Sequence, residues 1–98
     1  MEFFEVICHK KGILEIVVKK PLTFETINNT IPHKDIAHIP QKGVHQITID
    51  CSKMTEIDSC GLSLLSLITK KHASKRVSVT KMNSKYNKLK ALYINQQT

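Results

Sequence analysis

The feature that most constrains the fold is a buried strand that ends, turns and re-enters as a helix within residues 49–62. Apolar residues alternate over 44–51, which predicts a strand. Asp58 and Ser59 then precede a leucine-rich run that reaches Lys70 and predicts a buried helix with a basic carboxyl end. Either side chain can cap that helix by accepting hydrogen bonds from its first free amides.

Gly61 lies inside the first turn of the predicted helix. A glycine at such a position costs about 1 kcal/mol relative to alanine. We therefore expect a close backbone approach at Gly61, either by the sheet beneath it or by a partner above it. Taken alone, Asp58 and Ser59 indicate no more than helix capping.

The rest of the chain alternates strands with helices after an opening hairpin. Apolar and β-branched residues over 3–8 and 13–18 flank a short polar turn and predict two paired strands, the second of them covered on much of both faces. A short helix is expected near 23–31, before a stretch interrupted by Pro32 and Pro40.

A strand at Val77 and Val79 follows the leucine-rich helix, and Asn83 or Ser84 is expected to cap a final helix. The apolar face of that helix holds Tyr86, Leu89, Leu92 and Tyr93. The order β-β-α-β-α-β-α predicts an α/β fold, a mixed and mostly parallel sheet of about four strands with helices packed against it. We expect one domain over residues 1–98.

No residue pattern indicates catalysis or a bound cofactor. Cys8, Cys51 and Cys60 show no paired spacing, which indicates free thiols in a reducing, cytoplasmic compartment. The five histidines have no supporting ligand spacing, and the three isolated glycines make no phosphate-binding loop. We therefore expect a protein that is not an enzyme, with no metal and no other cofactor. Neither a secretory signal nor a membrane span is expected.

Charge is distributed unevenly along the chain. Residues 1–58 hold seven Lys and eight acidic residues, net −1, while residues 59–98 hold eight Lys or Arg and no acid, net +8. A basic face on residues 70–90 is expected to meet acids on a partner or anionic lipid headgroups, with a solvated lysine-rich surface as an equal alternative. Nucleic-acid binding is a weaker alternative, because only Tyr86 and Tyr93 offer aromatic rings in the basic half.

The strand-to-helix junction resembles the motif of STAS domains, the fold of anti-sigma-factor antagonists and of the small cytoplasmic subunit of the bacterial phospholipid-transport (Mla) ABC system. The shared pattern is apolar-Asp-apolar-Ser, a short turn, then Asp-Ser/Thr-small-Gly-Leu opening a leucine-rich helix. Here it reads Ile49-Asp50-Cys51-Ser52 and Asp58-Ser59-Cys60-Gly61-Leu62. The resemblance spans nearly the whole chain and implies the STAS fold.

Within that family the chain looks closer to the Mla subunit, judging by its short length, the run from Leu62 to Ile68 and the Leu92-Tyr93 ending. The resemblance implies an MlaB-like, non-catalytic subunit that binds and supports the MlaF-like ATPase of a lipid-transport ABC complex. Such a subunit is cytoplasmic and peripheral to the inner membrane through its partner complex.

The resemblance also implies where the partner docks. The docking residues it implies are Asp58, Ser59, Cys60, Gly61, Leu62 and Tyr93. In the antagonist branch the position of Ser59 is phosphorylated by an anti-sigma kinase, and the added charge of about −1.5 to −2 beside Asp58 would release an acidic or apolar partner. The alternative function is therefore an anti-sigma-factor antagonist regulated by phosphorylation of Ser59.

Overall fold

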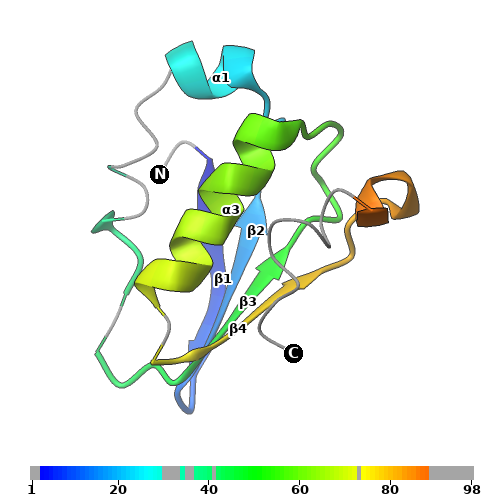
Figure 1. Ribbon diagram of the computed structural model, residues 1–98. Helices are drawn as coiled ribbons and strands as arrows, with labels where there is room; N and C mark the ends of the chain where they lie inside the picture. The colour runs from blue at the N-terminus through cyan, green and yellow to red at the C-terminus, as the bar shows by residue number, and fades with distance from the viewer. Residues whose placement is uncertain (1–2, 30–33, 35–36, 41, 73, 89–98) are drawn as a thin grey trace.

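The computed structural model describes residues 3–29, 34, 37–40, 42–72 and 74–88. Its elements in chain order are β1 (Phe4–Lys10), β2 (Ile13–Val18), α1 (Phe24–Asn29), β3 (Gln46–Asp50), α3 (Ser59–Lys71), β4 (Arg76–Thr80) and the short 3-10 helix η1 (Ser84–Tyr86). The strands lie in the order β1-β2-β3-β4, with β1 antiparallel to β2 and the other pairs parallel (Figure 1). This confirms the predicted mixed, mostly parallel α/β sheet.

The β1–β2 hairpin closes through a two-residue turn at Lys11 and Gly12. Both residues have positive φ angles, 55° and 79°, as in the turns whose twist matches that of the flanking strands. The ladder pairs Lys10 with Ile13 and shifts register between Val6 and Cys8. The predicted hairpin is therefore confirmed, with β1 extended to the turn itself.

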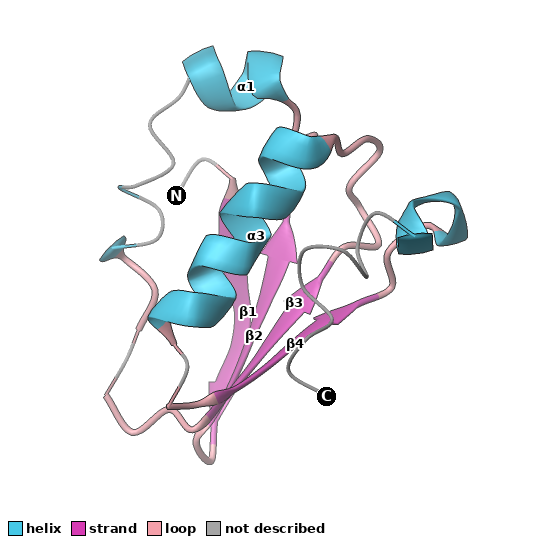
Figure 2. Ribbon diagram, viewed as in Figure 1, coloured by secondary structure: helices cyan, strands magenta, loops and turns pink. Residues whose placement is uncertain are grey.

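The helix α3 covers one face of the sheet and closes the core (Figure 2). Leu62, Leu65 and Ile68 recur at a spacing of three residues and are fully buried, so they form the inner face of the helix. They belong to one cluster with the inward residues of the parallel strands, Leu14, Ile16, Val18, Ile47 and Ile49. The predicted strand at 44–51 and the predicted helix that follows it are both confirmed.

Two expectations about apolar residues are only partly right. Val17 on the outer face of β2 is 3% exposed, but Ile13 is 40% exposed because it begins the strand beside the hairpin turn. Leu67 belongs to the run predicted to be buried, yet it is 45% exposed. At about 100° per residue, Leu67 falls on the side of α3 away from Leu65 and Ile68.

The final helix is described only at its start. Asn83 opens η1 as predicted, since its Oδ1 accepts a hydrogen bond of 3.0 Å from the Lys85 amide. Leu89, Leu92 and Tyr93 of the predicted helix lie outside the described residues. Among the helices that the structure describes, none combines the length and the apolar character needed to cross a bilayer.

Candidate functional site

Asp58 connects the start of α3 to the start of α1. Its Oδ1 accepts a hydrogen bond of 3.1 Å from the amide of Gly61, the third residue of α3. Its Oδ2 accepts one of 2.8 Å from the amide of Phe24, the first residue of α1. One carboxylate therefore satisfies free amides at two helix starts, where the partial positive charge of each helix also favours it.

Backbone pairing brings these two helix starts together. Leu22 forms a parallel bridge with Ile57. The Leu22 amide donates to the carbonyl of Glu56 at 2.9 Å, and the Asp58 amide donates to the carbonyl of Leu22 at 3.2 Å. The segment that enters α1 thus lies against the segment that enters α3.

Gly61 is where α3 meets that crossing. A Cβ built on Gly61 would overlap the carbonyl oxygen of Leu22 and lie 2.6 Å from Leu22 Cβ and 2.8 Å from Ile57 Cγ1. Real Cβ atoms do not approach neighbours so closely. The expected close approach at Gly61 is therefore real, and its neighbour is the chain's own segment leading to α1.

The residues implied as docking residues divide into exposed and buried groups. Ser59 and Cys60 are exposed and Asp58 is half-buried, whereas Gly61 and Leu62 are buried. A partner touching this helix start would meet the first two side chains, while the buried pair shapes the helix start from below. Tyr93 lies outside the described residues.

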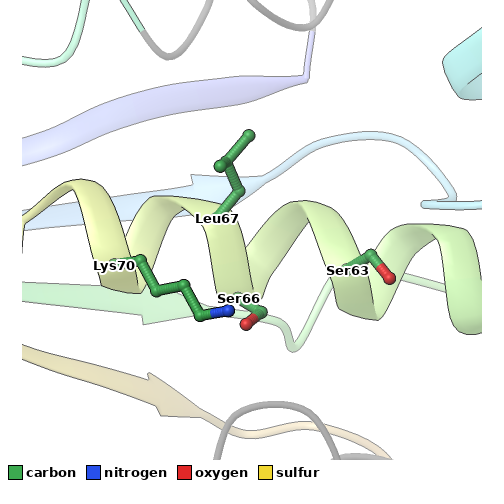
Figure 3. Close-up of a pocket in the computed structure, with 4 residues that line it drawn as sticks. All are labelled: Ser63, Ser66, Leu67 and Lys70. Carbon is green, nitrogen blue, oxygen red and sulfur yellow. The ribbon is translucent and has the colours of Figure 1, made fainter.

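The exposed side of α3 continues from this start as a single stripe. We call it the outer stripe; its members recur at helical spacing and are Ser59, Cys60, Ser63, Leu67 and Lys70. Ser63, Ser66, Leu67 and Lys70 line a shallow hollow of about 200 Å³ on the stripe (Figure 3). The stripe carries serine hydroxyl groups at its beginning, an apolar side chain at Leu67 and a positive charge at its end.

Sequence reasoning missed two exposed apolar side chains near this site. Leu67 is one, and Phe24, which begins α1 and bonds Asp58 through its amide, is 52% exposed. The spacing of the buried residues of α3 could have indicated that Leu67 is exposed, because it falls outside the face that Leu62, Leu65 and Ile68 form. No local signal was available for Phe24, because its place beside Asp58 depends on a hydrogen bond between residues 34 positions apart.

A second carboxylate anchors the turn that leads to α3. Asp50, at the end of β3, is buried, and its Oδ1 accepts a hydrogen bond of 2.8 Å from the Ser52 amide. Lys81 Nζ lies 3.6 Å from Asp50 Oδ2. The hydrogen bonds from Ser52, assisted by the Lys81 charge, hold the pKa of Asp50 below its ordinary value of 3.8, although burial opposes them.

The basic residues that the structure describes in the second half of the chain do not form one face. Because α3 runs antiparallel to β4, Lys70 and Lys71 lie at the same end of the molecule as Arg76 (Figure 1). Lys81 and Lys85 follow the other end of β4. In the part of the chain that the structure describes, no group of three or more His, Cys, Asp or Glu side chains is arranged to hold a metal ion.

Known proteins match the chain at the level of one family and one fold. The STAS domain family model matches residues 6–83. The murine solute carrier 26 family member A9 anion transporter, solved in its inward-facing state, is similar with a TM-score of 0.56 and 17% identity. The match covers 84% of this chain but only 14% of the transporter chain, and at that identity it shows the fold alone. No curated protein sequence matches the chain.

Proposed function

The chain belongs to the STAS domain family, and on that premise we propose that it is a non-catalytic subunit that binds and supports the ATPase of a phospholipid-transport ABC complex. STAS domains are often non-catalytic and are associated with transporters or act as anti-sigma-factor antagonists. The resemblance of the helix start to that of the Mla subunit favours the transporter partner. The inner-membrane location of that partner would place this chain peripherally at the membrane.

The observation that carries the proposal is the exposed surface around Asp58. Phe24 and the outer stripe lie beside the start of α3. That start is fixed by the two hydrogen bonds to Asp58 and by the close packing of Gly61 against Leu22. An exposed aromatic residue beside a fixed helix start is a typical anchor of a protein interface, since complete burial of such a side chain gains about 1.5–3 kcal/mol. Such geometry supports docking, because little ordering is needed when the partner binds.

The residue types of the outer stripe indicate which side chains a partner surface would need in order to fit it. The exposed Leu67 favours an apolar side chain of the partner at the middle of the stripe. Lys70 is exposed and residues 59–98 contain no acid, so the end of the stripe favours acidic residues on the partner. Ser59 and Cys60 are small and allow the partner's backbone to approach the helix start closely.

The second candidate, an anti-sigma-factor antagonist, is favoured by the position of Ser59. Its side chain is exposed at the first residue of α3, where a kinase can reach it. A phosphate there would lie next to the carboxylate of Asp58 and would change the charge of the helix start by about −1.5 to −2. The partner in this case is an anti-sigma kinase.

Co-purification with the neighbouring gene products decides between the two candidates. The tagged chain is expressed with the ATPase encoded in the same operon and captured at low salt. Retention of the ATPase supports the proposal, and failure of the pair to co-purify contradicts it. Neighbouring genes for a serine kinase and a sigma factor, instead of a permease and an ATPase, would favour the antagonist.

A further inference from the structure

One end of the molecule gathers exposed basic side chains from four segments of the chain. This end is where β1 finishes, where β2, β3 and β4 begin, and where α3 finishes (Figure 1). We call it the basic pole; its exposed cations are Lys10, Lys11, Lys42, Lys70, Lys71 and Arg76. Half of them come from the part of the chain whose net charge is −1, so no single sequence segment marks the pole.

Hydrogen bonds join the segments of the basic pole one to the next. The amide of His45 donates to the carbonyl of Gly12 in the hairpin turn at 2.9 Å, and the amide of Arg76 donates to the carbonyl of His45 at 3.0 Å. Lys75 Nζ donates to the carbonyl of Val44 at 2.8 Å, and its amide donates to the carbonyl of His72 at the end of α3. The segments that carry the cations are therefore held together at one end of the sheet.

Five of the six acidic side chains in the described part of the chain lie away from this surface. Those at or beside the opposite end of the sheet and helices are Glu5, Glu25, Asp50, Glu56 and Asp58. Glu15 is the exception: it is half-buried within β2, two residues from Ile13, and is paired with Cys8 and Thr48. Glu2 and Asp35 lie outside the described residues. A surface of one charge sign attracts counter-charged partners over about a Debye length.

We propose that the basic pole binds the headgroups of an anionic lipid bilayer. The cations are exposed lysines on turns and element ends, with one arginine, and such positions suit a surface whose charges are mobile. Ile13, 40% exposed beside the hairpin turn, adds one apolar contact at the same pole. Each Lys or Arg near an anionic membrane raises partitioning about fivefold, the equivalent of about 1 kcal/mol.

The described part of the pole has few of the features that favour a nucleic acid or an acidic protein. Of the Phe and Tyr residues that the structure describes, Phe3, Phe4, Phe24 and Tyr86 all lie toward the opposite end, so the rings at the described part of the pole are the smaller imidazoles of His9 and His45. An acidic protein partner would favour an apolar or aromatic anchor among the charges. Ile13 is the one large apolar side chain exposed at the described part of the pole.

The proposed orientation leaves the site around Asp58 accessible, while Lys70, at the end of the outer stripe, also belongs to the basic pole. The 13 residues of α3 separate the basic pole from Ser59 by about 20 Å, at about 1.5 Å per residue. A molecule resting on a bilayer through its basic pole therefore presents Phe24 and Ser59 away from the lipid. The inference does not depend on which partner docks there.

Sedimentation with vesicles tests the proposal. The purified full chain is mixed with vesicles of phosphatidylcholine alone or with a third of the lipid replaced by phosphatidylglycerol. Binding to the anionic vesicles, little binding to the neutral ones and a steep loss with added salt are expected. The triple variant Lys10→Glu, Lys42→Glu and Arg76→Glu should bind the anionic vesicles at least tenfold more weakly.

A matched triple variant separates the pole from the net charge of the protein. Lys53→Glu, Lys85→Glu and Lys88→Glu make the same change in charge at exposed residues toward the other end, and should retain most of the binding. Circular dichroism checks that both variants fold, and the glutamine versions of the same triples repeat the comparison at a smaller charge change. Equal loss in the two triples, no binding to anionic vesicles at low salt, or preference for duplex DNA or polyglutamate over vesicles would overturn the proposal.

Discussion

The amide of Phe24 donates a hydrogen bond of 2.8 Å to the carboxylate of Asp58, 34 residues further along the chain. This bond ties α1, a helix of only six residues, to the start of α3. The same carboxylate also accepts a hydrogen bond from the amide of Gly61, the third residue of α3. A helix as short as α1 is not stable by itself, so its position depends on such contacts. The backbone of the exposed Phe24 is held beside Asp58, the residue that precedes Ser59, by this arrangement.

Replacing Asp58 should weaken both helix starts. Asp58→Ala removes two acceptors and is expected to lower the free energy of unfolding by about 1–3 kcal/mol, since a single lost cap costs about 0.5–2 kcal/mol. Asp58→Asn keeps one carbonyl oxygen and should lose less. Urea unfolding followed by circular dichroism measures both, and an Asp58→Ala variant as stable as the native chain would show that the carboxylate holds neither helix.

Gly61→Ala should destabilise the protein although alanine is the better helix former. The added methyl group would overlap the carbonyl of Leu22, and overpacking of this kind costs about 1–3 kcal/mol, more than the gain of about 1 kcal/mol in helix propensity. Ser63→Ala, on the exposed side of the same helix, serves as the control and should change stability by less than about 0.5 kcal/mol. A gain in stability for Gly61→Ala would mean that the segments do not cross so closely.

Replacing two different leucines of α3 by alanine should have different effects, one mainly on stability and the other mainly on partner binding. Leu65 is fully buried, so Leu65→Ala is expected to cost about 2–5 kcal/mol of stability. Leu67 is 45% exposed, so Leu67→Ala should cost less than about 1 kcal/mol and instead reduce capture of the partner. Thermal melting and co-purification of the same two variants check this, and similar melting temperatures would show that the inner face of α3 is assigned incorrectly.

The pH dependence of stability should reveal Asp50. Its pKa in the folded protein is lowered from 3.8, chiefly by hydrogen bonds from Ser52, so the ionised form stabilises the fold. That stabilisation is complete above the unfolded-state pKa and disappears as the pH falls through the folded-state value.

Urea unfolding at neutral pH and at successive values below pH 4 measures this contribution. The difference in stability between the native chain and Asp50→Asn should be largest at neutral pH and should shrink as the solution becomes more acidic. A difference that is constant over the whole range would contradict the role of the ionised carboxylate. Because the other titrating groups are common to both proteins, their contributions largely cancel in the comparison.

Local sequence signals were sufficient for most of the fold. The alternation at 44–51, the leucine-rich run and the glycine-containing turn each report on neighbouring residues, and the corresponding elements appear where they were expected. Capping by Asp58 could also be predicted from the sequence, because the amide of Gly61 that it accepts from is only three residues away.

The surroundings of the site depend on contacts that local patterns do not contain. The overlap of Gly61 with Leu22 and the bond from Phe24 to Asp58 both arise from the crossing of two distant segments. The basic pole likewise combines Lys10 with Arg76 through the pairing of strands. Counting charges along the chain placed the basic residues in one half, whereas the topology divides them between two ends.

A binding titration of the ATPase subunit against variants with a charge added to the chain tests whether the partner docks at the start of α3. The ATPase subunit is titrated with the native chain, with Ser59→Asp and with Ser74→Asp, which puts the same charge at an exposed residue beyond the other end of α3. All three proteins are expected to fold. Ser59→Asp should weaken binding by more than about 1 kcal/mol, about fivefold in Kd, while Ser74→Asp should bind like the native chain. Equal affinity of Ser59→Asp and the native chain would contradict docking at the start of α3.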